Sequence, residues 1–83
     1  MKRDYKRMEK RGKDMRKLDN ILLMLAHQEA LPARYRDHQL TGNLAGSREC
    51  HVEPDWLLIY QIAEEQLILY ATDTGTHSEL FKK

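Results

Sequence analysis

The 83-residue chain has little of several things that decide the class of a protein. It contains one cysteine, Cys50, which excludes an intramolecular disulfide and a paired-cysteine metal knuckle and favours a reducing cytoplasm. No apolar run approaches the roughly 20 residues that a membrane-spanning helix needs, and the charged N-terminus lacks the apolar stretch of a secretion signal. We therefore expect a soluble, cytoplasmic protein with no membrane contact, folded as a single domain over residues 1–83.

The net charge is small, but the charged residues are unevenly distributed. The formal net charge is +1. Residues 1–17 nevertheless contain nine Lys or Arg against three Asp or Glu, whereas the rest of the chain contains five basic and ten acidic residues. A basic end on an acidic domain favours a polyanionic or acidic protein partner, although a solvated helix face explains the same charges equally well.

The first third of the chain predicts two helices. Residues 2–11 are rich in helix formers, Gly12 is suited to end that helix, and Asp14 is suited to cap the next. Apolar residues then repeat at helical spacing until the Leu31-Pro32 pair. We interpret this repeat as the core face of a helical hairpin.

The remainder predicts strands. Residues 32–46 form a long connector with turn residues, and strands are expected at 47–52, 56–62 and 66–72, with a turn at 63–65. Short turns between them predict an antiparallel meander. Helices followed by strands predict an α+β fold, with the N-terminal helical hairpin packed on a small antiparallel β-sheet.

Titratable side chains are concentrated in the stretch RECHVEPDW. Glu49, His51, Glu53 and Asp55 occupy every second position. In an extended chain this spacing places them on one face, at least until Pro54 bends it. A polar face next to the apolar run that follows is a candidate site.

Three of the four histidines lie outside the predicted apolar helix faces. His38 is in the connector, His51 is on the polar face, and His77 follows a glycine turn, so the three can converge on one site. His27 is near the end of the second helix, where an imidazole commonly faces solvent or the helix terminus, and we set it aside.

Several chemistries were weighed for these residues. Zinc is disfavoured because the histidines are widely spaced and no HxH or HExxH pair occurs. A nucleophilic hydrolase is disfavoured because no nucleophile elbow is present and Cys50 and His51 point to opposite faces of a strand. Acid–base catalysis without metal or cofactor fits better, with Asp55 or Glu49 orienting an imidazole.

Cleavage of RNA requires this combination of groups. A base removes the proton of the ribose 2′-hydroxyl, the oxygen attacks the adjacent phosphate, and an acid protonates the leaving 5′-oxygen. Trp56 and Phe81 offer surfaces on which a base could stack, although a place in the core explains Trp56 equally well.

The chain closely resembles the YafQ branch of the RelE superfamily of bacterial toxins in three blocks, RDHQLTG, RECHVEPDWLLIY and TGTHSELF, with KDM at the start of the second helix. The resemblance covers nearly the whole chain. It implies a toxin of a type II toxin–antitoxin system with a RelE-like fold, a ribosome-dependent endoribonuclease that cleaves mRNA in the A site. It also implies a cognate antitoxin as a partner that holds the toxin inactive.

The same resemblance assigns roles by position. The catalytic residues that it implies are His38, His51, Asp55 and His77. We expect His77 to be the general acid, His38 or His51 the general base, and Asp55 the orienting group. The predicted substrate contacts are Arg48, Glu49, Trp56 and Phe81, and the predicted contacts with ribosomal RNA are Lys6, Lys10 and Lys13.

Two features depart from the family pattern. Relatives begin with a β-strand, whereas this sequence begins inside the first helix, so we expect a sheet that lacks this strand and exposes an edge for another chain or for self-association. Asp73 precedes TGTH where many relatives have a basic residue, and an acidic group is unfavourable near a phosphate. The alternative function is therefore a catalytically weakened interaction protein that binds antitoxin, and the ribosome, without cleaving RNA.

Overall fold

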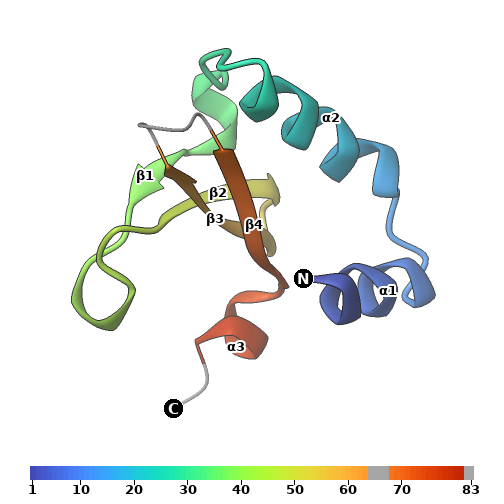
Figure 1. The fold of residues 1–83 in the computed structure, drawn as a ribbon. Coiled ribbons are helices and arrows are strands. Elements are labelled where there is room, and N and C mark those ends of the chain that lie inside the picture. The colour runs from blue at the N-terminus through green and yellow to red at the C-terminus, as the bar shows by residue number, and fades with distance from the viewer. Residues whose placement is uncertain (64–67, 82–83) are drawn as a thin grey trace.

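The fold combines helices and one antiparallel sheet, as expected, in a computed structural model that describes residues 1–63 and 68–81 (Figure 1). Within these residues the helices are α1 (Lys2–Lys10), α2 (Met15–Ala26) and α3 (His77–Leu80). The strands are β1 (His38–Gln39), β2 (Arg48–Glu53), β3 (Trp56–Ala63) and β4 (Ile68–Gly75), joined in the order β1-β2-β3-β4. Two 3-10 turns, η1 (Ala33–Tyr35) and η2 (Gly42–Leu44), lie in the connector. The α+β prediction and the meander are confirmed.

Local signals set the boundary between the first two helices. Gly12 has a φ of +79°, a left-handed conformation that ends α1 and that a side chain would disfavour. Asp14 caps α2, because its Oδ1 accepts a hydrogen bond from the backbone N–H of Arg16 at 3.1 Å. Both predictions are confirmed. α2 ends at Ala26, before the Leu31-Pro32 pair as predicted, and Gln28 turns the chain with a φ of 60°.

β2 and β3 begin and end within one residue of their predicted positions, whereas β4 continues to Gly75 instead of ending at residue 72, and one strand was missed. The prediction treated 32–46 as a loop and missed β1, whose two residues pair with the start of β2. Residues 64–67, which include most of the turn predicted at 63–65 and the start of the strand predicted at 66–72, lie outside the described residues. β1 and β4 form the two edges of the sheet in the part of the chain that is described.

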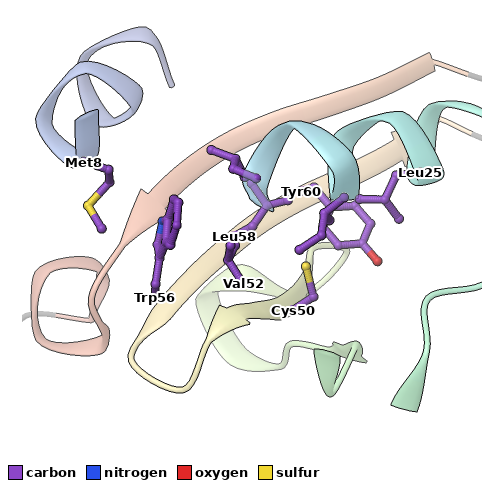
Figure 2. Close-up of a cluster of buried hydrophobic side chains, with 9 residues drawn as sticks. Met8, Leu25, Cys50, Val52, Trp56, Leu58 and Tyr60 are labelled. Carbon is purple, nitrogen blue, oxygen red and sulfur yellow. The ribbon is translucent and has the colours of Figure 1, made fainter. Parts of the chain in front are cut away.

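One face of the sheet packs against α1 and α2 (Figures 1 and 2). Burying this face supplies most of the hydrophobic stabilisation that a chain of this size can obtain. The buried residues of this core are Met8, Leu18, Ile21, Leu25, Cys50, Val52, Trp56, Leu58 and Tyr60. Among the described residues, no helix is long and apolar enough to span a membrane.

Candidate functional site

The polar residues of β2 lie on the face of the sheet opposite the helices. Cys50 and Val52 point into the core, and side chains alternate along a strand, so Glu49 and His51 point to the other face. The strand register places His38 opposite Glu49. Two predicted catalytic histidines therefore flank one glutamate.

These three side chains meet through their charged atoms. The Nε2 atom of His38 lies 3.4 Å from Oε1 of Glu49, and the Nε2 atom of His51 lies 3.8 Å from the same oxygen. The Glu49 side chain is 7% exposed, against 50% for His38 and 20% for His51. A buried carboxylate oxygen is thus shared by two imidazoles that reach solvent to different extents.

The other ring nitrogens fix the tautomers of both histidines. The Nδ1 atom of His38 lies 2.7 Å from the carbonyl oxygen of Arg36, and that of His51 lies 3.3 Å from the carbonyl oxygen of Pro54. A carbonyl oxygen only accepts, so each Nδ1 carries the proton and donates it. The Nε2 atom of each ring faces Glu49, and it attracts the carboxylate only when it carries a proton. A proton taken up by either Nε2 is stabilised by the carboxylate, which is the arrangement that a general base requires.

The position of His38 depends on its neighbour in the chain. Oδ1 of Asp37 accepts hydrogen bonds from the Tyr60 hydroxyl at 2.5 Å and from Nε of Arg48 at 3.2 Å. Burial and the hydrogen bond with Asp37 raise the pKa of Tyr60, so its hydroxyl remains a donor at neutral pH. Arg36 is held in the left-handed region with a φ of 49°. The anchored Asp37 and the sharp turn at Arg36 both precede His38 directly and aim its imidazole at Glu49.

The third predicted histidine lies on α3, which is tied to α1. Thr76 and Glu79 form a capping box: the backbone N–H of Thr76 donates to Glu79 Oε1 at 2.9 Å, and the N–H of Glu79 donates to the Thr76 hydroxyl at 3.3 Å. Glu79 also lies 3.1 Å from Nε of Arg7 and 2.6 Å from Nη2 of Arg11. The hydrogen bond from the Thr76 backbone, together with these arginines, lowers the pKa of Glu79 to about 2.

This helix presents a histidine and an aromatic ring together. The rings of His77 and Phe81 lie 4.8 Å apart between centroids, tilted by 39°. Phe81 is only partly buried and His77 is exposed. Both side chains predicted for the C-terminal half of the site are therefore accessible to a ligand.

The two halves of the site lie two strands apart in the sheet. His51 pairs with Leu57, and Leu57 pairs with Gly75, two residues before His77. Two strand spacings separate His51 from Gly75, about 10 Å. Within residues 1–63 and 68–81, no hydrogen bond or ion pair joins His77 to the other two histidines. The structure brings His38, Glu49 and His51 together and leaves His77 and Phe81 on the far side of Leu57.

The prediction that Trp56 contacts substrate is wrong for this structure. Its side chain is fully buried in the core, and its Nε1 donates to the Thr74 hydroxyl at 2.8 Å (Figure 2). That hydroxyl in turn donates to the carbonyl oxygen of Leu57 at 2.7 Å. The indole has no free face on which a base could stack, so the reading of Trp56 as a core residue is the correct one.

Glu49 and Arg48 make contacts within the protein, and their contact with substrate stays a prediction. Both were expected to contact substrate, but Glu49 is buried between the imidazoles and Arg48 is partly buried against Asp37. Asp55 is exposed in the turn after β2. In the described part of the chain it has no hydrogen bond or ion pair to a histidine, and its orienting role stays a prediction. Glu49, which pattern alone had offered as an alternative to Asp55, is the carboxylate that contacts both imidazoles.

The basic N-terminal segment separates into two groups. Lys6 and Lys10 are exposed on α1, as the predicted contacts with ribosomal RNA require. Lys13 instead lies 3.3 Å from Oε1 of Glu53 and is partly buried. A role for Lys13 in RNA contact would first require this ion pair to open.

Two further groups bear on the chemistry. Partial desolvation and the neighbouring Asp4 carboxyl of α1 raise the pKa of Asp73, whose charge was expected to oppose a phosphate. Burial raises the pKa of the Cys50 thiol to about 12, so it is not a nucleophile. No group of three or more His, Cys, Asp or Glu residues in the described residues is placed to hold a metal ion.

Sequence reasoning missed two contributors to the site. Asp37 precedes His38 in the RDH block, but its bonds to β2 and β3 depend on long-range packing. No role was predicted for Arg34 and Arg36, which lie in the same connector. Their alternation around Tyr35, immediately before RDH, was the signal that could have identified a second surface beside His51.

Comparison with known proteins gives a consistent result. A family model described as "Bacterial toxin of type II toxin-antitoxin system, YafQ" matches residues 1–82. The mRNA interferase toxin YafQ of Escherichia coli strain K12 is 45% identical over 80 residues, covering 95% of this chain and 85% of that protein.

Solved structures agree with the sequence relatives. The crystal structure of YafQ from E. coli strain BL21(DE3) has a TM-score of 0.92 at 41% identity and covers 98% of this chain and 89% of that chain. YafQ in the E. coli DinJ-YafQ complex has a TM-score of 0.88 at 43% identity, with coverage of 98% and 89%. Helices packed on a small antiparallel sheet are thus an architecture shared with bacterial toxins. The chain belongs to the YafQ family of toxins of type II toxin–antitoxin systems.

Proposed function

We propose that this protein is an mRNA interferase, an endoribonuclease that cleaves mRNA by acid–base transesterification without a metal. Its membership of the YafQ family supports this activity. The observation that carries the mechanism is the convergence of two Nε2 atoms, from His38 and His51, on one buried oxygen of Glu49. Such a cluster can accept a proton and stabilise the resulting charge.

The base belongs to the half of the site formed by β1 and β2. Nε2 of His38 or His51 takes the proton of the ribose 2′-hydroxyl, and Glu49 stabilises the imidazolium that forms. The 2′-oxygen attacks the adjacent phosphorus as its bond to the 5′-oxygen breaks. The products are a 2′,3′-cyclic phosphate and a 5′-hydroxyl end.

The acid belongs to α3. His77 in its protonated form gives a proton to the leaving 5′-oxygen, and Phe81 positions the neighbouring base by stacking. An in-line displacement needs base and acid on opposite sides of the phosphorus. The two halves of the site lie on either side of Leu57 and meet this requirement when an RNA strand crosses the sheet between them.

The setting that we propose is the translating ribosome in the cytoplasm, with mRNA cleaved in the A site. The exposed Lys6 and Lys10 of α1 supply contacts to phosphates of ribosomal RNA. The E. coli relative has been solved as a complex with DinJ. By analogy, we infer that a cognate antitoxin binds this chain, which acts as a single domain over residues 1–83.

Cleavage in a translating extract tests the proposal. Wild-type protein should cut a reporter mRNA at A-site codons, as mapped by primer extension, and His77→Ala should slow cleavage by roughly 100- to 10,000-fold, the usual contribution of a general acid. His27→Ala is the matched control, because His27 is exposed at the end of α2 and away from the site. Full cleavage by His77→Ala would refute the assignment. Binding of the antitoxin without any cleavage by wild-type protein would instead identify an interaction protein.

A further inference from the structure

A cleft opens beside His51 that the mechanism above does not use. Its volume is about 500 Å³, and it lies between α2, the η1 turn and the end of β2. The side chains that matter to the argument are Lys17, Arg34, Tyr35, Arg36, His51 and Glu53. One catalytic imidazole therefore belongs to two adjoining surfaces, the cluster with Glu49 and this cleft.

The cleft exists because β1 is short. β1 pairs with Arg48 and Glu49 and extends no further along β2. In the described residues, the η1 turn rather than a strand lies beside the later part of β2. Because η1 is a turn, side chains lie along this edge of β2 in place of a ladder of backbone hydrogen bonds to a neighbouring strand.

The charges in the cleft are mostly positive. Lys17, Arg34 and Arg36 line it together with one carboxylate, Glu53. Glu53 is already engaged by Lys17 at 2.8 Å and Lys13 at 3.3 Å, and the hydrogen bond from Lys17 lowers its pKa. Two guanidinium groups therefore remain in excess at neutral pH, in a cleft large enough for a phosphate and part of a nucleotide.

Both arginines are placed by local contacts. The guanidinium of Arg34 lies over the ring of Tyr35, 4.8 Å from its centroid, and donates to the Tyr35 hydroxyl at 3.0 Å. Arg36 occupies the left-handed turn whose carbonyl oxygen accepts from Nδ1 of His38. The same turn that aims His38 at Glu49 therefore carries a guanidinium into the neighbouring cleft.

We propose that this cleft binds a phosphodiester group of single-stranded RNA, adjacent to the one that is cleaved. The proposal rests on the proposed endoribonuclease function and specifies where the strand lies. Guanidinium groups recognise phosphate oxygens through paired N–H donors. Continuity with His51 favours RNA over an acidic protein segment, because a strand held here extends directly to the catalytic imidazole.

Binding of a non-cleavable RNA tests the cleft separately from catalysis. The probe is a short single-stranded oligoribonucleotide with 2′-O-methyl groups, and its fluorescence anisotropy is followed over a series of salt concentrations. Arg34→Gln and Arg36→Gln should each weaken binding several-fold at low salt and reduce the slope of log K against log salt by about 0.7. Arg16→Gln is the matched control, since its exposed side chain lies on α2 and does not line the cleft.

Comparison of these variants with the wild type distinguishes failure of the cleft proposal from failure of the proposed endoribonuclease function. If wild-type protein cleaves mRNA in the translating extract but Arg34→Gln and Arg36→Gln bind the probe no more weakly than Arg16→Gln, the cleft proposal is overturned and the endoribonuclease proposal stands. If the two variants lose affinity for an acidic peptide but not for the probe, the cleft is a protein-binding site and the proposal is also overturned. The phosphodiester assignment is supported if inorganic phosphate displaces the probe only at a concentration far higher than that of the probe. It also requires that the variants lose affinity for phosphate and for the probe to the same extent.

Discussion

Replacing Glu79 with Gln should loosen the attachment of α3, the helix that presents His77. Glutamine keeps the length of the side chain, and its amide oxygen can still accept from the Thr76 backbone, so the cap remains. The substitution removes the negative charge that lies 3.1 Å from Arg7 and 2.6 Å from Arg11. It is therefore a test of the ion pairs alone.

The expected loss at pH 7 is roughly 1–2 kcal/mol in the free energy of unfolding. Lowering the pKa of Glu79 from its ordinary 4.5 to about 2 would correspond to roughly 3 kcal/mol by linkage. The largest cause of that shift is the Thr76 backbone hydrogen bond, which glutamine keeps. The arginine side chains are 34% and 44% exposed, so solvent screens both ion pairs, and the smaller figure applies.

The pH dependence has a definite sign. Because folding lowers the pKa of Glu79, its contribution is complete above about pH 4.5 and is lost as the pH falls toward 2. The difference between wild type and Glu79→Gln should therefore narrow steadily between pH 5 and pH 3. Urea is the suitable denaturant, since guanidinium chloride would itself screen the ion pairs.

The control is Glu9→Gln, which removes an exposed carboxylate from α1 and should change stability by no more than about 0.5 kcal/mol. A stability difference for Glu79→Gln that is as large at pH 3 as at pH 7 would refute the electrostatic account. So would the absence of any difference at pH 7.

Two other predictions concern the core. Trp56→Phe should lower the free energy of unfolding by about 2 kcal/mol, because the hydrogen bond to Thr74 is lost and part of the indole volume is left unfilled. Cleavage by the folded protein should be nearly unchanged. Loss of cleavage at unchanged stability would return Trp56 to the substrate site. Burial raises the pKa of Cys50 to about 12, so iodoacetamide at pH 8 should alkylate Cys50 in urea but not in the native protein. Mass spectrometry measures the extent of alkylation, and rapid labelling of the native protein would contradict the buried position of Cys50.

The parts of the fold that could be predicted from sequence are those that local chemistry determines. Gly12 and Asp14 mark a helix end and a helix start through backbone conformation and capping, which neighbours along the chain decide. The alternation of Glu49 and His51 with Cys50 likewise separates the two sheet faces by period alone. Such signals need no knowledge of what packs against them.

The parts that could not be predicted depend on residues far apart in sequence. β1 has two residues, too few for periodicity, and exists because His38 pairs with Glu49 across the connector. The bond between Arg11 and Glu79 joins positions 68 residues apart. The resemblance to a family carried residue positions but not burial, and for this reason it placed Trp56 in the substrate site when pattern alone had left the core open.

The alternation along β2 makes the core and the site depend on one strand register. A shift of β2 by a single residue would turn Glu49 and His51 toward the helices and bring Cys50 and Val52 to the opposite face, which carries His38. That molecule would bury unpaired charge and lose much of its core, so it would not persist as a folded protein. Correct folding and correct placement of the histidines therefore depend on the same strand register, and a stably folded molecule has its histidines in place. Restraint of the activity must then come from outside the fold, which is the task that a bound antitoxin would perform.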